Sequence, residues 1–268
     1  MALFDSVADD YHRYRPGVPD DVVQLLAGIL AGVVEPTVVD LGAGTGQVAL
    51  ALLPALPPSA RLDLVDQDKG MLSAAMEALR PHLGERTAVP HAVRAEEFAP
   101  APPGYRADLV TCCRSFHWMD RPAVLAMADR VTTRTAAFAL LGDGSLWTHQ
   151  ADWTAALKEL IQTHLGEGRR AGTTGAYSGP GRRYEDDLAD SAFSDVTEQR
   201  FPFTRTWTPA GVIGYLRSTS FARPDLFPDH ARFEEQALEL LEAHAQDGPL
   251  NEESVFTVLV ARRPKAAR

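Results

Sequence analysis

Short apolar runs alternate with amphipathic helical patterns through the first 145 residues of the chain. The apolar runs predict five strands, at residues 37–41, 61–66, 87–93, 107–112 and 135–141. The amphipathic patterns predict helices at residues 20–31, 47–53, 70–79 and 121–131. Strands that are apolar on both faces are expected where helices cover both sides of a parallel sheet. The pattern therefore predicts an α/β fold.

The pattern changes after residue 141, where a helix is predicted at residues 152–165 and a stretch rich in Gly, Arg and Ser follows. Two further strands and two helices are then predicted, at residues 196–203, 255–261, 209–218 and 229–245. We interpret about residues 142–195 as an inserted cap over the substrate site, within one domain of residues 36–268. Residues 1–35 are expected to form an N-terminal lid and a helix.

Composition and charge restrict the possible partners. The net charge is −10 and the isoelectric point is near 5.3, which argues against nucleic acid, because phosphate backbones attract basic surfaces. No apolar run approaches the ~20 residues that a bilayer span requires, and the first residues lack the apolar core of a secretory signal. We therefore expect a cytoplasmic protein with a small-molecule substrate and no membrane partner.

The two cysteines, Cys112 and Cys113, are neighbours within an apolar run. Adjacent side chains on a strand point to opposite faces, so the pair is unsuited to a shared metal site. We expect no metal centre and interpret both cysteines as small buried residues.

A glycine-rich turn follows the first predicted strand, where residues 38–46 read VVDLGAGTG. A dinucleotide-binding turn has a third glycine where this chain has Gln47, and no lysine follows as in a P-loop. Asp40 would repel a pyrophosphate but could pair with an amino group, while free N–H groups at the start of the next helix could bind a carboxylate. The turn therefore favours an amino-acid-like ligand.

The second predicted strand ends at Asp66, one strand–helix–strand step after the glycine turn. An acidic side chain at this position is suited to the hydroxyl groups of a ribose. The alternative is that Asp66 caps the following helix, but Asp68 fits that cap better. We therefore predict that Asp66 binds a ribose.

Four segments in this order resemble the motifs of class I S-adenosylmethionine-dependent methyltransferases: residues 40–46, 65–72, 94–98 and 108–118. The last segment resembles the small-molecule enzymes of the methyltransferase-11 group, which includes relatives of trans-aconitate methyltransferase. A further pattern of that group is present at Phe4, Ala8, Tyr11, Arg15 and Pro16. The resemblance implies a Rossmann-like fold with a seven-stranded, mostly parallel sheet and an antiparallel last strand. It also implies S-adenosylmethionine as the cofactor and S-adenosylhomocysteine as the product.

The resemblance implies a set of cofactor-binding residues: Asp40, Gly42, Gly44, Gly46, Asp66, Gln67, Met71, Ala95, Glu96 and Arg114. The glycines would lie beneath the methionine part of the cofactor, and Asp40 would bind its amino group directly or through water. Asp66 would hold the ribose, with Gln67 or Met71 beside the adenine and residues 95 and 96 at the adenine edge. Met71 could instead be a core residue of its helix.

The loop after the fourth strand lies at the carboxyl edge of the sheet, where ligands bind in such folds. Its histidine, His117, is of a type that ordinarily titrates near neutral pH, so it could act as a general base or could position the cofactor. Tyr11 is predicted to close over the site as a lid, with simple packing as the alternative. The residues assigned to catalysis are His117, Tyr11 and Phe116. The residues assigned to the substrate are Tyr14, Trp118, Tyr177 and Arg217.

Three functions remain open on this sequence. The first is methyl transfer to an N or O atom of a small molecule, as in natural-product biosynthesis. The second is carboxyl methylation of a small acid, with Arg114, Arg182 or Arg217 as anion clamps. The third is a protein that binds the cofactor without methyl transfer, such as a cyclase or a regulator. A nicotinamide oxidoreductase is disfavoured by Gln47.

Overall fold

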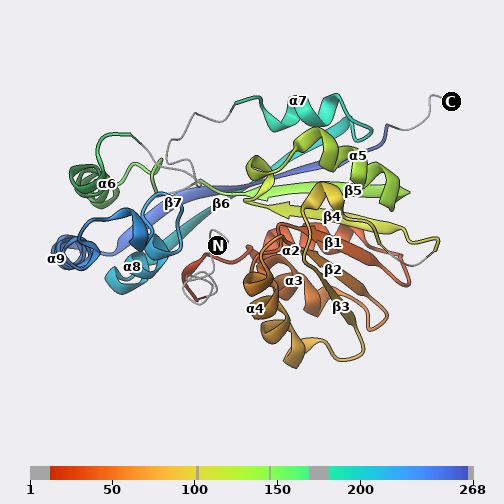
Figure 1. Ribbon diagram of the computed structural model, residues 1–268, viewed down its shortest axis with the longest axis horizontal. Helices are drawn as coiled ribbons and strands as arrows, with labels where there is room; N and C mark the ends of the chain where they lie inside the picture. The colour runs from red at the N-terminus through yellow and green to blue at the C-terminus, as the bar shows by residue number, and fades with distance from the viewer. Residues whose placement is uncertain (1–12, 101–102, 145, 169–180, 265–268) are drawn as a thin grey trace. The chain divides into compact units, whose positions relative to one another are not determined.

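The computed structural model of the chain describes residues 13–100, 103–144, 146–168 and 181–264. Tyr11 and Tyr177, assigned above to the lid and the substrate, lie outside these ranges. The sheet has seven strands in the order β3-β2-β1-β4-β5-β7-β6 (Figure 1). The strands are β1 (Thr37–Leu41), β2 (Arg61–Val65), β3 (Thr87–His91), β4 (Ala107–Cys113), β5 (Thr132–Gly142), β6 (Asp195–Trp207) and β7 (Leu250–Arg262).

Strand pairing confirms the mostly parallel sheet. β1 pairs in parallel with β2 and with β4, and the parallel pairing continues outward to β3 and β5. β7 pairs antiparallel with β5, from Ala137 opposite Arg262 to Gly142 opposite Thr257. Because parallel strands end at one edge of a sheet, the residues that follow β1, β2 and β4 meet at that edge.

The chain divides into two compact units, and the sheet unit consists of Gly17–Gly142, Pro180–Phe201 and Phe256–Arg268. Its helices are α2 (Asp20–Ile29), α3 (Gln47–Leu52), α4 (Lys69–Leu79), α5 (Arg121–Val131) and α7 (Tyr184–Ala189). Its short 3-10 turns are η1 (Leu53–Ala55), η2 (Arg80–His82), η3 (Ala95–Glu97) and η4 (Phe116–Trp118). The central strands are buried on both faces: Val39 and Val110 point to one face, their chain neighbours Val38 and Leu109 point to the other, and all four are at most 1% exposed. This double burial explains why these strands read as continuous apolar runs.

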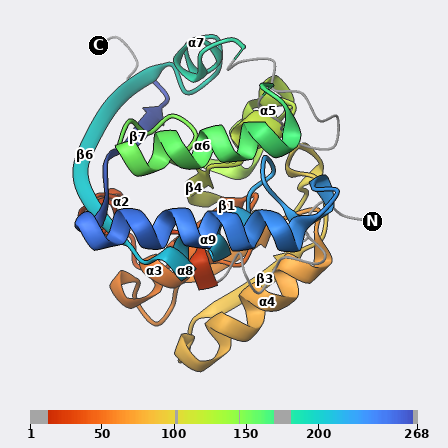
Figure 2. The same ribbon diagram turned by 90° about the vertical axis from the view of Figure 1, so that its left-hand side faces the viewer.

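The helical unit consists of Met1–Pro16, Asp143–Gly179 and Pro202–Val255. Its helical elements are α6 (Asp152–Leu165), α8 (Pro209–Arg217), η5 (Pro224–Leu226) and α9 (His230–Asp247). Figure 2 shows α6 and α9 side by side, and Trp153 and Leu157 of α6 share a core with Phe233 of α9. None of the described helices is both long enough and apolar enough to cross a membrane.

This division differs from the predicted insertion of about residues 142–195. Residues 180–201 belong to the sheet unit, whereas residues 202–255 join residues 143–179 in the helical unit. The physical reason is the core of the helical unit, in which Trp207 and Leu216 pack in the same cluster as Trp153. A boundary set by packing between distant segments leaves no change of local pattern in the sequence.

One carboxylate inside the sheet unit, Asp63 on β2, has no exposed side-chain surface. It accepts hydrogen bonds from Arg61 at 2.8 Å and from the Tyr105 hydroxyl at 2.7 Å, and it lies 2.6 Å from His91 Nε2. Burial alone would raise the pKa of Asp63, but the hydrogen bonds from His91, Arg61 and Tyr105 lower it. The cluster ties β3 and the loop before β4 to β2.

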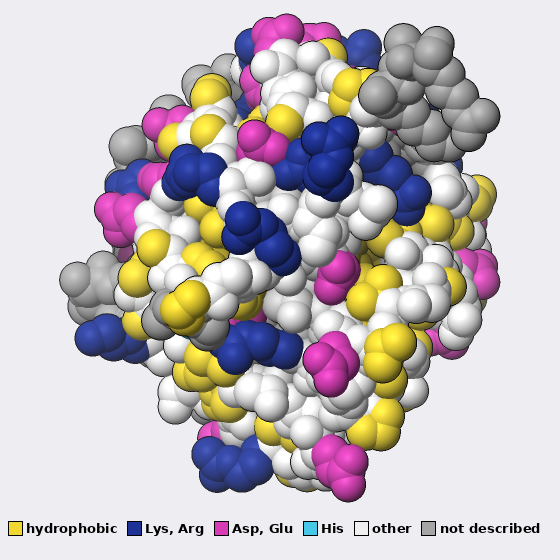
Figure 3. Space-filling model, turned by 90° about the vertical axis from the view of Figure 1, so that its right-hand side faces the viewer, with side chains coloured by type: hydrophobic (Ala, Val, Ile, Leu, Met, Phe, Trp, Pro, Cys, Tyr) yellow, Lys and Arg dark blue, Asp and Glu magenta, His cyan; other side chains and the backbone are white. Residues whose placement is uncertain are grey.

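Arginine residues recur at the edge of the sheet where the parallel strands begin. Arg61 opens β2, Arg106 immediately precedes β4, and Arg134 lies early in β5. Figure 3 shows dark blue Lys and Arg side chains spread over one face of the molecule. These three arginines lie at the edge of the sheet opposite to the edge at which Asp40 lies.

Candidate active site

Asp40 lies near the carboxyl end of β1 and is 2% exposed. Its Oδ1 accepts a hydrogen bond from the hydroxyl of Thr111, its register partner on β4, at 2.7 Å. Its Oδ2 is buried and accepts no hydrogen bond from any residue that the structure describes. Burial, aided by the charge of Asp66, raises the pKa of Asp40 to about 7, although the Thr111 bond lowers it. An ammonium group would satisfy the remaining oxygen and favour the ionised form.

The turn after β1 requires glycine. Gly42, Gly44 and Gly46 have φ angles of 63°, 54° and 78°, in the left-handed region that other residues avoid. At Gly42, a Cβ atom would also lie 2.6 Å from the Cβ of Ser115. The N–H of Gly42 donates to the carbonyl of Val65 at 2.8 Å, which fixes the turn against the end of β2. A backbone without side chains here can approach a ligand closely.

Asp66 directly follows β2 and takes part in the same turn. Its Oδ2 accepts the N–H of Gly44 at 2.9 Å, and its Oδ1 accepts the N–H of Asp68 at 2.9 Å. Burial raises the pKa of Asp66. The Oδ1 of Asp68 accepts the N–H groups of Gly70 and Met71 at 2.8 and 3.1 Å, so Asp68 is confirmed as the cap of α4. Asp66 is thus held by backbone N–H groups of the turn and of the start of α4, and ribose binding stays a prediction.

The residues assigned to the adenine side come from the start of α4 and from η3. Gln67 is exposed, whereas Met71 is 2% exposed and belongs to the buried face of α4. Ala95 is 7% exposed, and Glu96 accepts a hydrogen bond from Arg94 at 2.7 Å. The structure therefore places Met71 among the core residues, which was the alternative stated for it.

The turn η4 after β4 joins one buried ring to two exposed ones. Phe116 is 2% exposed and lies between Phe138 and Tyr184, at centroid distances of 5.9 and 5.4 Å. His117 and Trp118 are exposed, Trp118 to 45%, and their ring centroids are 4.6 Å apart. Phe116 can thus contribute through the position of the turn, whereas His117 and Trp118 have open surface for an acceptor.

Arg114 and Ser115 connect β4 to η4. Among the described residues other than glycine, Arg114 alone has a positive φ, of 57°, and its N–H donates to the Leu141 carbonyl at 2.9 Å. Its guanidinium lies 5.4 Å from the centre of the Phe256 ring. The Ser115 hydroxyl donates to the Leu41 carbonyl at 3.1 Å, which ties this loop to the end of β1. Left-handed residues other than glycine are concentrated at functional turns.

The cysteines of β4 differ in burial. Cys112 is 1% exposed and its Sγ lies 3.2 Å from Ser115 Oγ, whereas Cys113 is half-buried, so the interpretation as two buried residues holds fully for Cys112. Burial raises the pKa of the Cys112 thiol. In the described part of the chain, no group of three or more His, Cys, Asp or Glu side chains could hold a metal ion.

Two residues assigned to the substrate, Tyr14 and Arg217, belong to the helical unit. Tyr14 packs so closely on Gly214 of α8 that a Cβ atom there would overlap its ring. Arg217 forms a two-point ion pair with Glu234, at 2.5 and 2.7 Å. Both side chains are engaged within their own unit, and their assignment to the substrate stays a prediction.

Thr111 and Ser115 belong to this site, although the sequence analysis assigned them no role. A signal for Thr111 was available, because it is a hydroxyl residue inside an otherwise apolar strand. In a parallel pair, that strand places it beside Asp40. No comparable signal marks Ser115, whose contact with Gly42 depends on the folded turn.

Comparison with known proteins indicates which family of proteins this part of the chain is similar to. Residues 39–138 match a family model described as a methyltransferase domain. Residues 39–138 are therefore similar to a methyltransferase domain. The matched range of this domain contains every residue assigned to the cofactor, together with the turn η4. The family supports S-adenosylmethionine as the cofactor and methyl transfer as the class of reaction.

Individual proteins similar to this chain are also methyltransferases. The chain is 34% identical over 158 residues, 58% of its length, to malonyl-[acyl-carrier protein] O-methyltransferase of Geobacter sulfurreducens, and it spans 57% of that relative. Its fold is similar to a structure assigned as a type II methyltransferase of Anaeromyxobacter dehalogenans, with TM-score 0.62, 17% identity and coverage of 93% and 98% of the two chains. It is also similar to phosphoethanolamine N-methyltransferase 2 of Haemonchus contortus, with TM-score 0.54, 14% identity and coverage of 97% and 58%. At these identities the two solved structures show a shared fold.

Proposed function

We propose that this chain transfers a methyl group from S-adenosylmethionine to a small molecule, and that the acceptor atom is a carboxylate oxygen and not a hydroxyl oxygen or a nitrogen. The observation that carries the proposal is the buried Asp40 carboxyl beside the left-handed glycine turn, of which one oxygen accepts no hydrogen bond from the described residues. The similarity to a malonyl-[acyl-carrier protein] O-methyltransferase supports a carboxylate, because a malonyl thioester offers one free carboxylate. We place the reaction in natural-product biosynthesis, on the resemblance of the β4 loop to small-molecule enzymes.

The residues present fit the cofactor group by group. Asp40 Oδ2 would accept the ammonium of the methionine part, which removes the cost of a buried oxygen without a donor. Asp66, which follows β2 beside the glycine turn, would accept hydrogen bonds from the ribose hydroxyls. Because Asp66 also binds the N–H of Gly44, the two subsites share one turn.

S-adenosylmethionine, when bound, supplies a methyl group that is attached to a positively charged sulfonium. Transfer of this methyl group leaves a neutral thioether. The remaining task of the chain is to align the acceptor and to exclude water. A carboxylate acceptor needs no general base, so His117 would orient the acceptor instead of removing a proton. Trp118, 45% exposed, would offer its ring to the apolar part of the acceptor.

The three candidate anion clamps, Arg114, Arg182 and Arg217, differ in their positions and contacts. Arg182 binds Asp187 and Asp190, and Arg217 binds Glu234. Arg114 directly follows β4, at the edge of the sheet where Asp40 lies. We therefore assign the acceptor carboxylate to Arg114 within this proposal, because a guanidinium binds a carboxylate through two parallel hydrogen bonds.

The test is a labelled-methyl assay with the purified chain, S-adenosylmethionine, a malonyl thioester, and matched hydroxyl and amine compounds. We expect label in a product that mild base releases, as an ester requires. Label that resists base would replace the carboxylate with an N or hydroxyl acceptor. If the chain binds S-adenosylhomocysteine but methylates none of the three classes of compound, the alternative function is favoured, namely a protein that binds the cofactor without methyl transfer. Binding of NADH in its place would contradict the cofactor itself.

A further inference from the structure

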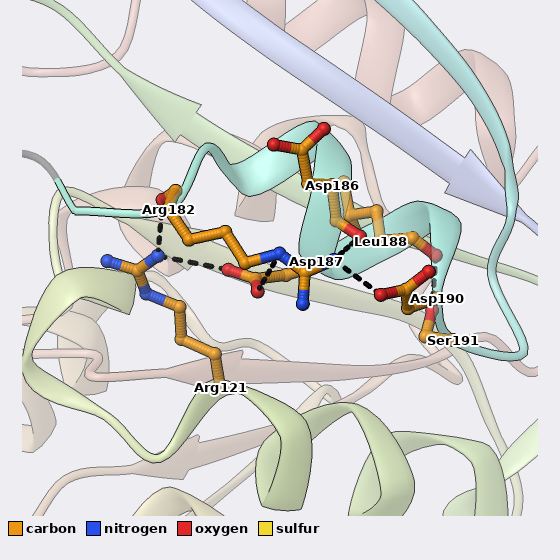
Figure 4. Close-up of polar contacts among 7 residues, drawn as sticks. All are labelled: Arg121, Arg182, Asp186, Asp187, Leu188, Asp190 and Ser191. Atoms are coloured by element: carbon orange, nitrogen blue, oxygen red, sulfur yellow. Dashed lines mark hydrogen bonds and ion pairs between the residues drawn. The ribbon is translucent and has the colours of Figure 1, made fainter.

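A charged cluster joins α7 to the start of α5 (Figure 4). Arg121, the first residue of α5, donates from Nη1 to Asp187 Oδ2 at 2.9 Å and to the carbonyl of Arg182 at 2.8 Å. The Asp187 side chain is 6% exposed, and Arg182 Nε lies 3.5 Å from its other oxygen. The α7 helix has six residues, too few to be stable alone, so its position depends on such contacts.

An aromatic contact continues from this cluster to the loop after β4. The Arg121 guanidinium lies 4.7 Å from the centre of the Tyr184 ring, which meets Phe116 edge to face at 5.4 Å. Phe116 also contacts Phe138 of β5, at a centroid distance of 5.9 Å. Phe116 therefore lies between a strand residue and a residue that α7 supplies.

Phe116 in turn sets the geometry of η4. The Phe116 carbonyl accepts the N–H of Met119 at 3.3 Å, and the Ser115 carbonyl accepts the N–H of Trp118 at 2.9 Å. A shift of the Phe116 ring would therefore move the backbone that carries the two exposed rings, His117 and Trp118. Both rings are exposed to solvent, and their centroids lie 4.6 Å apart.

We propose that Tyr184, Arg121 and Asp187, here named the α7 brace, position the loop after β4 for the methyl acceptor. Tyr184 presses on Phe116, while the Arg121–Asp187 ion pair holds α7 and Tyr184 in place. The three are positioning residues, because none of them is assigned to substrate or cofactor. The part of the inference that concerns the acceptor rests on the proposed function, whereas the link from Tyr184 to Trp118 does not.

Fluorine NMR of the full chain labelled with 5-fluorotryptophan tests that link directly. The chain has four tryptophans, and the Trp118 line is assigned by its loss in Trp118→Phe. We expect Tyr184→Ala to shift or broaden the Trp118 line and to leave the Trp147, Trp153 and Trp207 lines in place. Tyr184→Phe, which keeps the ring, should restore the original line. Glu185→Gln, on the exposed Arg183–Glu185 pair of the same helix, is the matched control and should change nothing.

The kinetic readout separates positioning from binding. In the methyl-transfer assay, Tyr184→Ala should lower kcat by about tenfold or more, with the KM for S-adenosylmethionine changed less than about twofold. Asp187→Asn, a milder change that keeps the volume, should act in the same direction. An unmoved Trp118 line in folded Tyr184→Ala would overturn the brace. Absence of methyl transfer in the unaltered chain would overturn the proposed function alone, because the fluorine result stands without turnover.

Discussion

The carboxylate of Asp66, at the end of β2, accepts the backbone N–H of Gly44, in the turn after β1, at 2.9 Å. Within the proposed function, one side chain would thus serve both the sugar subsite and the turn beneath the methionine part. Asp66→Ala should weaken the binding of S-adenosylhomocysteine by about tenfold or more, which corresponds to about 1.4 kcal/mol per decade. Titration calorimetry measures the change. Glu77→Ala, on the exposed face of α4, is the control, and equal affinities of Asp66→Ala and the unaltered chain would remove Asp66 from the site.

The raised pKa of Asp40 makes the stability of the ligand-free chain depend on pH. In the folded chain this carboxyl keeps its proton up to about pH 7, whereas in the unfolded chain it loses the proton near pH 3.8. Ionisation therefore favours the unfolded chain between these values, and stability should fall as the pH rises from 4 to 7. Asp40→Asn should remove this part of the fall, on the order of 3 kcal/mol. Urea unfolding at several pH values tests it, and parallel profiles for the two chains would contradict it.

Gly42 combines a left-handed backbone with a close neighbour. Gly42→Ala should reduce the free energy of unfolding by about 1–3 kcal/mol, because φ is 63° and the new Cβ would meet Ser115. Gly28→Ala is the matched control in α2, where a Cβ has open space, and it should raise stability by up to about 1 kcal/mol. Urea unfolding of both variants measures the two effects. Equal responses would show that the turn tolerates a side chain.

His117 distinguishes a carboxylate acceptor from one that must lose a proton. For a carboxylate, His117→Gln should lower kcat by less than about tenfold, since a true general base contributes about a hundredfold or more. The kcat of the unaltered chain should then stay level across the range in which a histidine ordinarily titrates. A kcat that rises through that range and is lost in His117→Gln would assign general-base catalysis instead.

Asp63 should matter for stability and not for the cofactor. Asp63→Asn leaves Arg61 and His91 without their buried carboxylate, so the free energy of unfolding should fall by on the order of 3 kcal/mol. Because the pKa of Asp63 is lowered, its contribution is present above the ordinary value of 3.8 and is lost as the pH falls through the lowered pKa. Glu198→Gln, from the exposed Arg200–Glu198 ion pair, should change stability by less than about 0.5 kcal/mol. Similar losses for the two variants would contradict the structural role of Asp63.

The central sheet and its first turn could be predicted from the sequence, because their signals are local. Five apolar runs, the glycines after Asp40 and the cap at Asp68 each act within a few residues. The α7 helix gives no such signal, since Glu185, Asp186 and Asp187 fill half of it and leave no apolar stripe. Its position follows from Arg121, 66 residues away in the chain.

The end of β6 and the start of β7 could not be predicted from the local sequence pattern either. β6 alternates exposed and half-buried residues, so its apolar signal fades before Trp207, where the strand ends. β7 begins at Leu250, ahead of the predicted residue 255, within a polar stretch that includes the buried Glu252. Glu252 is accommodated because Arg205 and the indole of Trp207, both on β6, donate hydrogen bonds to it at 2.8 Å. The sequence gives no local signal for this contact between two strands.

The single oxygen of Asp40 that lacks a donor has a thermochemical consequence. With its pKa at about 7, the carboxyl is about half protonated at neutral pH. An arriving ammonium would stabilise the charged form, so occupation of the crevice should expel a fraction of a proton into the medium. The heat of association at neutral pH would then differ between phosphate and Tris, whose ionisation enthalpies differ.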